Sequence, residues 1–232
     1  MKIRIKFKKH GLIKFIGHLD LIRAWQKIFR RSDIPIAYSE GFNPHQIFSI
    51  AAPLAVGITS DGEYLDLKLS VEAYDLNQLV DEINMTSPEG IEVIEAVELI
   101  DKETAGMAAC KLARYEVTLS PELNALFDKE KVLGFLNSET IIVQKRNKKG
   151  KYNDLDLKAG MFEYEFDNGM FKLLLATGSS LNVKPELLLT ALFKFLNIEL
   201  ESFTRELYYM IHRIDIYMSH EPLLTLTEGV AK

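Results

Sequence analysis

The sequence contains one cysteine, Cys110, and this scarcity excludes several classes of protein. A single thiol cannot form an intramolecular disulfide or build a multi-cysteine zinc or iron–sulfur site within the chain. No Gly-x-x-x-x-Gly-Lys-Ser/Thr or Gly-x-Gly-x-x-Gly pattern occurs, which argues against a P-loop and a dinucleotide site. Cys110 has no histidine near it in the sequence, so a nucleophilic role is not indicated. We expect no resident metal and no cofactor.

Long apolar runs are also missing. No stretch reaches the roughly 18 apolar residues that a membrane span requires. The N-terminal sequence MKIRIKFKK lacks the apolar segment of a signal peptide. These absences predict a cytoplasmic protein that does not contact a membrane, while 47% hydrophobic residues in a chain of 232 suffice for a substantial core.

Positive charge is concentrated at the N-terminus. Residues 1–31 carry ten of the 28 Lys and Arg residues and one acid, Asp20, which gives this segment a net charge of +9 and leaves the rest at −14. Such asymmetry is typical of a surface that faces a polyanion on a body that otherwise repels it. Alternatively, the cations of Lys2–Lys8 are only the solvent face of an edge strand, where lysine discourages aggregation.

Residues 1–100 predict alternating strands and helices. Lys2–Lys8 alternates polar and apolar residues, which places Ile3, Ile5 and Phe7 on the inner face of a strand. From His18 to Arg31, apolar residues recur every three or four positions, the pattern of an amphipathic helix. The further predicted elements are an extended segment with a turn at 36–50, a strand at 63–69, a helix at 76–84 capped by Asp75 and a strand at 91–99.

The pattern repeats after a connector at residues 101–112. The predicted strands are 114–119, 140–145, 162–166, 170–176 and 204–218, and the predicted helices are 129–137 and 184–196. Asp167-Asn168-Gly169 joins two of these strands as a hairpin. The order of elements predicts an α+β protein of two tandem ferredoxin-like (βαββαβ) halves, residues 1–100 and 113–219, followed by a frayed tail at 220–232.

His18 and Asp20 lie at the predicted junction between the first strand and the first helix. His18 could act as a general base or bind phosphate, and Asp20 could orient it or act at the start of the helix. Alternatively, both only satisfy backbone donors at the turn. A metal site would require His45 and Glu40 to meet them in space, which the sequence does not indicate.

The segment Tyr38–His45 is a second candidate site. Gly41 allows a close approach of the backbone, and the rings of Tyr38 and Phe42 could stack on a base. Asn43 and His45 could hydrogen-bond the edge of that base. The same composition also suits an ordinary structured turn.

Several N-terminal motifs resemble a known family. They are Phe15-Ile-Gly-His-Leu-Asp-Leu-Ile-Arg23, Arg30-Arg31, Ile34-Pro35, Tyr38-Ser-Glu-Gly-Phe-Asn-Pro-His45 and Pro53-Leu-Ala-Val-Gly57. On these motifs the chain resembles the radical-SAM-linked protein family over nearly its whole length. The resemblance implies a partner rather than an activity, because members are encoded beside, or fused to, a radical S-adenosylmethionine enzyme and have no assigned function. Gly17 and Gln46 stand where that family has serine and proline, and Gly17 removes a possible hydroxyl ligand or nucleophile.

A basic segment in the second half, Lys145–Lys158, is the third candidate site. A loop with several positive charges can follow a phosphate backbone, and its affinity would then fall with salt. A solvated hairpin tip accounts for the same composition without a ligand.

We therefore predict a non-catalytic RNA-binding or adaptor protein that acts with a radical SAM enzyme in RNA modification or processing. The residues predicted to contact RNA carry a positive charge, a ring or a hydrogen-bonding group: Lys14, His18, Arg23, Lys27, Arg30, Arg31, Tyr38, Phe42, Asn43, His45, Lys145, Arg146, Lys148, Lys149 and Lys151. Two alternatives stay open. One is a protein-docking subunit without RNA, and the other is a metal-independent ferredoxin-like endoribonuclease with His18 or His45 as acid or base.

Overall fold

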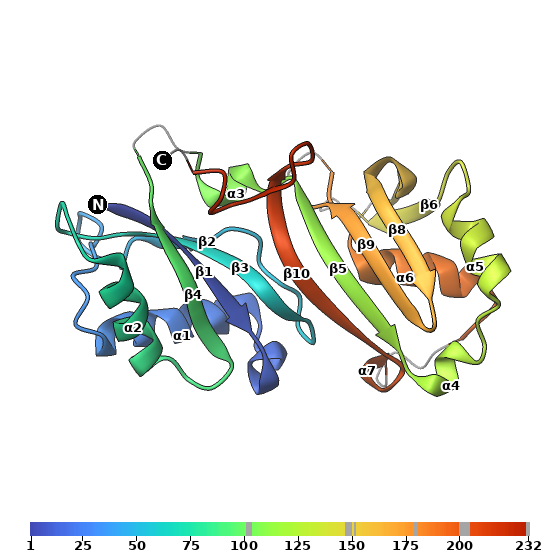
Figure 1. The fold of residues 1–232 in the computed structure, drawn as a ribbon, viewed down its shortest axis with the longest axis horizontal. Helices are drawn as coiled ribbons and strands as arrows, with labels where there is room; N and C mark the ends of the chain where they lie inside the picture. The colour runs from blue at the N-terminus through green and yellow to red at the C-terminus, as the bar shows by residue number, and fades with distance from the viewer. Residues whose placement is uncertain (101–103, 147–149, 151, 179–180, 200–204, 231–232) are drawn as a thin grey trace. The chain divides into compact units, whose positions relative to one another are not determined.

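The computed structural model describes residues 1–100, 104–146, 150, 152–178, 181–199 and 205–230. The chain divides into two compact units, Met1–Lys111 with Arg213–Lys232, and Leu112–His212. Helices and antiparallel strand pairs occur in both units, in keeping with the expected α+β class (Figure 1). Among the described residues, no helix is long and apolar enough to cross a bilayer.

The first unit is built around strand β1. Its strands are β1 (Lys2–Lys9), β2 (Phe48–Ile50), β3 (Thr59–Lys68), β4 (Ile91–Glu98), the end of β10 (Tyr209–Ser219) and β11 (Leu224–Thr225). Their order is β4-β1-β3-β10, with β2 also paired to β3 and β11 to β10. Because β1 pairs antiparallel with both β3 and β4, it is an interior strand, and the edge-strand interpretation of its cations is wrong.

One face of β1 forms the core of this unit. Ile3, Ile5 and Phe7 are fully buried, as the alternating pattern predicts. They belong to one apolar cluster with Trp25 and Leu79, so α1 (His18–Arg31) and α2 (Leu76–Thr86) both pack on this face. The ring centroids of Phe7 and Trp25 lie 4.9 Å apart in an edge-on arrangement.

The helices of the first unit begin where the sequence provides a cap or a break. The side chain of Asp75 accepts hydrogen bonds from the first turn of α2, as predicted. Between β1 and α1 the chain forms a short 3-10 helix, η1 (Gly11–Phe15), which starts at Gly11 with a φ of +56°. The short helix α3 (Gly106–Ala109) lies in the predicted connector.

The second unit has a separate set of strands. They are β5 (Leu112–Leu119), β6 (Ile142–Arg146), β7 (Tyr152–Asp156), β8 (Met161–Asp167), β9 (Met170–Ala176) and the start of β10. Its helices are α4 (Pro121–Asn124), α5 (Lys129–Leu136), η2 (Lys158–Gly160), α6 (Pro185–Phe195) and α7 (Arg205–Tyr208). The strand order is β10-β5-β9-β8, and β6 pairs with β7 in a ribbon of its own. The predicted hairpin joins β8 to β9 through Asn168 and Gly169, both at positive φ.

Three predicted features of the chain differ from the structure. The strand predicted at 140–145 is β6, and it pairs with the unpredicted β7 instead of the larger sheet. Residues 205–208, predicted as the start of a strand, form α7. The tail predicted to fray adds β11 to the first unit and buries Leu226, because a strand next to β10 satisfies its backbone groups.

Candidate nucleic-acid interface

Helix α1 has a buried apolar face and an adjoining face that carries its basic residues. Leu21, Trp25, Ile28 and Phe29 recur at three- and four-residue spacing and are buried against the sheet. The exposed face carries the cations Arg23, Lys27, Arg30 and Arg31. Arg23, Lys27 and Arg31 follow each other at four-residue intervals, so they form one ridge along the helix. We call these three residues the basic ridge.

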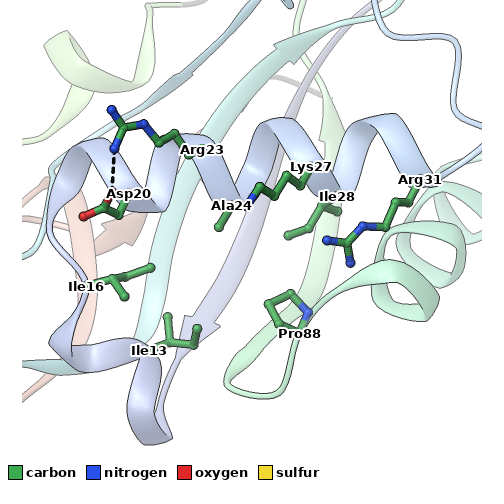
Figure 2. Close-up of a pocket in the computed structure, with 9 residues that line it drawn as sticks. All are labelled: Ile13, Ile16, Asp20, Arg23, Ala24, Lys27, Ile28, Arg31 and Pro88. Atoms are coloured by element: carbon green, nitrogen blue, oxygen red, sulfur yellow. Dashed lines mark hydrogen bonds and ion pairs between the residues drawn. The ribbon is translucent and has the colours of Figure 1, made fainter.

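The basic ridge borders a groove of about 310 Å³ in the first unit (Figure 2). Its lining residues come from η1, from α1 and from the loop between α2 and β4: Ile13, Ile16, Asp20, Arg23, Ala24, Lys27, Ile28, Arg31 and Pro88. The apolar members form the floor, and the three cations belong to the rim. The structure thus brings three of the predicted RNA contacts to one concave site.

The cations of α1 differ in how far they are already neutralised. Arg23 is paired with Asp20 at 2.8 Å, an exposed i,i+3 ion pair that also cancels the one carboxylate of the groove. Arg30 donates from Nε to the carbonyl of Gln26 at 3.1 Å. Within the described part of the chain, the side chains of Lys27 and Arg31 make no hydrogen bond or ion pair. Of the three cations of the basic ridge, Lys27 and Arg31 are therefore the two without a counter-ion among the described residues.

Lys14 lies in η1 and is half-buried. Its Nζ atom is 5.0 Å from the ring centroid of Phe15, a cation–π distance. Its carbonyl accepts a hydrogen bond from the backbone of Gly57 at 2.8 Å, which ties η1 to the loop between β2 and β3. The predicted contact Lys14 is thus placed beside the groove, although it is not one of its lining residues.

The segment Tyr38–His45 forms a closed, exposed loop. Tyr38 and Gln46 bridge its base, and Ser39 bonds both the backbone and the Nδ1 atom of His45, the latter at 2.8 Å. Gly41 has a φ of +108°, and the next residue, Phe42, is fully exposed. An aromatic ring held at a loop tip can stack on a base, and Asn43 beside it is exposed as well.

The three catalytic candidates have separate surroundings. His18 is exposed in the first turn of α1, Asp20 is bonded to Arg23, and His45 is bonded to Ser39. No hydrogen bond or ion pair among the described residues links the three. The described ranges also contain no cluster of His, Cys, Asp or Glu that could hold a metal ion.

The cations of β1 do not add to this basic surface. Arg4 pairs with Asp66 at 2.7 Å, and Lys8 pairs with Glu92 at 3.1 Å. Lys9 is 1% exposed, and burial lowers the pKa of its amine below the usual value. These three cations of β1 are therefore either buried or already paired with an acid of another strand.

Sequence reasoning missed a buried ionic network among residues of β1, β3 and β10. Glu63 and Arg213 form an ion pair that is almost fully buried, and Asp215 accepts hydrogen bonds from Lys6 and Tyr64. Burial and the charge of Asp215 raise the pKa of Tyr64 far above its usual range. The sequence of β3 carries three acids, Asp61, Glu63 and Asp66, but no local pattern in it indicates their partners on β1 and β10.

A family model described as "uncharacterized protein conserved in bacteria (DUF2344)" matches residues 2–185. The chain belongs to this family. No curated protein matches the chain. The groove of this DUF2344 member lies within the matched residues, since its lining extends from Ile13 to Pro88. The family description states no activity and no ligand.

The third candidate segment of the DUF2344 chain is described only in part. Lys145 and Arg146 end strand β6, where they pair in register with Asn153 and Tyr152 of β7. Three further predicted contacts, Lys148, Lys149 and Lys151, lie outside the described residues.

The single thiol of the DUF2344 chain is buried and protected. Burial raises the pKa of Cys110 from 9.0 to about 11, and its thiol donates to the carbonyl of Gly106 at 3.1 Å. Since the thiolate is the reactive form, two pH units correspond to a roughly 100-fold smaller thiolate fraction near neutral pH. We expect almost no reaction with an aromatic disulfide reagent at pH 8 in the native protein and one equivalent after denaturation. Rapid labelling of the folded protein would show that Cys110 is accessible.

Proposed function

We propose that the chain binds RNA through the basic ridge of α1 and serves a radical SAM enzyme as a non-catalytic RNA-binding or adaptor subunit in the cytoplasm. The observation that carries the RNA part is the groove bordered by Lys27 and Arg31, two cations without an internal counter-ion in the described chain. Cations left unpaired at a concave site attract phosphate, and the −14 charge of residues 32–232 repels it elsewhere. The partner rests on the N-terminal motifs that resemble the radical-SAM-linked family.

We also propose that each of the two units has a ferredoxin-like fold. The strand orders β4-β1-β3-β2 and β10-β5-β9-β8 support a ferredoxin-like arrangement in each, with the ribbon β6-β7 as an insertion in the second. Sheets of this kind are common RNA platforms, which is an argument by analogy only.

Exposed apolar residues on η1, at the start of α1 and in the loop before β3 support a second candidate function. Leu12, Leu19 and Val56 are aliphatic and exposed. Aliphatic side chains offer little to a stacked base but are useful at the centre of a protein interface. A docking subunit without RNA would use these residues together with the cations of α1 against an acidic partner surface.

Charge reversal of the basic ridge tests the RNA function directly. Fluorescence anisotropy with a labelled single-stranded RNA should give a plot of log affinity against log salt with a slope of about −1.4, as expected for about two neutralised phosphates. Lys27→Glu/Arg31→Glu should weaken binding at low salt at least about tenfold and flatten this slope.

A matched variant controls for net charge. Lys131→Glu/Lys184→Glu changes the same number of charges at exposed positions of the second unit and should bind like the wild type. Equal loss in both double variants would show a bulk charge effect and contradict the proposed site. If the wild type does not bind RNA, the RNA-binding function is wrong and the docking function replaces it.

A further inference from the structure

The groove beside α1 combines a basic rim with an apolar floor, and this combination discriminates between forms of nucleic acid. We infer that it binds single-stranded RNA, with an unpaired base on the floor and neighbouring phosphates on the basic ridge. The inference rests on the proposed RNA-binding function and adds the substrate class. It concerns the described residues of the first unit only.

The floor of the groove suits the face of a base. Ile13, Ile16, Ala24, Ile28 and Pro88 line it, and none of these side chains can donate or accept a hydrogen bond. A base is flat and apolar on its faces and polar only at its edges. An apolar floor therefore gains from covering a base face, but it cannot read which base is present.

The spacing of the cations on the rim suits an extended RNA strand. Lys27 and Arg31 are one four-residue step apart on α1, which corresponds to about 6 Å along the helix axis. Figure 2 shows both side chains on the same side of the helix as Ala24 and Ile28. A strand that lays a base on the floor can thus keep its flanking phosphates beside these two cations.

An exposed ring extends the site at one end. Phe15 belongs to η1, the same short helix that contributes Ile13 to the floor, and its side chain is 52% exposed. Lys14 lies over this ring with its amine 5.0 Å from the centroid. A ring beside a cation is a stacking platform for a further base of a single strand.

A duplex cannot use these apolar features. Its bases are stacked and paired inside, so that it presents phosphates, 2′-hydroxyls and base edges to a protein but no base faces. Contact with duplex would then be limited to Lys27, Arg31 and neighbouring cations, without any contribution from the floor.

The test compares one RNA in two forms. Fluorescein-labelled U12, alone and annealed to A12, is titrated by anisotropy with the full chain in the cold, in the lowest salt at which ultraviolet melting shows the duplex to be fully paired. We expect U12 to bind about tenfold more tightly than the duplex. Ala24→Phe fills the groove without changing charge, so it should weaken U12 binding about tenfold and leave duplex binding unchanged. Ala24→Met, which adds volume with a good helix former, repeats the test if the larger ring destabilises the protein.

Controls separate the inference from the function on which it rests. Ala125→Phe introduces the same ring at an exposed position of the second unit and should bind both RNAs like the wild type. Equal affinity for U12 and duplex, or no effect of filling the groove, would overturn the single-strand inference while RNA binding stands. Failure of the wild type to bind either RNA would overturn the proposed function itself.

Discussion

Glu63→Gln should lower the free energy of unfolding of the first unit by about 3–5 kcal/mol. Glu63 is fully buried, and Arg213 donates to it from Nε at 2.8 Å while its own side chain is almost fully buried. Glu63 also stabilises the charged form of Lys9, since its negative charge raises the pKa of that amine. Removing the carboxylate charge therefore takes away a buried acid that stabilises the charged forms of both Arg213 and Lys9. Urea unfolding followed by the fluorescence of Trp25, the one tryptophan of the chain, measures this loss in the first unit.

Glu92→Gln is the matched control for this substitution. It makes the same chemical change on strand β4, but Glu92 is exposed and its partner Lys8 is only half-buried, so the pair should contribute less than about 1 kcal/mol. Equal effects of the two substitutions would mean that the Glu63–Arg213 pair is open to solvent.

The stability of the Glu63→Gln variant should also respond to pH. The pKa of Lys9 is lowered in the folded protein by burial, and Glu63 opposes this lowering, so the variant should lower it further. Between that lowered pKa and the unfolded value of 10.5, the unfolded state binds more protons, and stability rises with pH. The deficit of the variant relative to the wild type, measured by urea unfolding, should therefore shrink as the pH is raised through the lowered pKa of Lys9 toward 10.5.

Local patterns were sufficient to predict the elements that place the basic ridge. The alternation of Lys2–Lys8 and the three- and four-residue spacing over His18–Arg31 correspond to β1 and α1 almost residue for residue. Both patterns are short-range, because each is imposed by the periodicity of one element against one apolar layer. Exposure of Arg23, Lys27 and Arg31 followed from the same spacing.

Long-range pairing could not be predicted in this way. In the alternating sequence of β1, Arg4 stands at a position where an exposed cation is expected. Its burial depends on the ion pair with Asp66 of β3, which the local sequence does not indicate. Arg213 and Asp215 return to the first unit from a position 150 or more residues away in the sequence. No local pattern predicts such long-range contacts. This is why the tail was predicted to fray and the charges of β1 were predicted to face solvent. The groove could not be predicted from local patterns either, because Pro88 reaches it from the loop between α2 and β4, far from α1 in the sequence.

Trp25→Ala should cost about 3–5 kcal/mol and should also abolish RNA binding by the basic ridge. Trp25 is fully buried on the inner face of α1, and its ring contacts those of Phe7 and Phe29 at centroid distances of 4.9 and 5.3 Å. A cavity at this point loosens the attachment of α1 to β1. The ridge cations would then lose their fixed spacing although none of them is changed. Thermal unfolding followed by circular dichroism, which does not depend on the lost indole, measures the stability.

Trp25→Phe separates the loss of packing from the loss of the indole N–H. Within the described residues, that N–H is buried and has no hydrogen-bond partner. Leaving a buried donor unpaired costs about 1–3 kcal/mol, so phenylalanine removes this penalty while it keeps most of the ring contacts. We expect Trp25→Phe to lose no more than about 1 kcal/mol and to retain RNA affinity. A loss as large as that of Trp25→Ala would mean that the indole N–H has a partner, and it would tie the position of the basic ridge to that hydrogen bond instead of to the aromatic cluster.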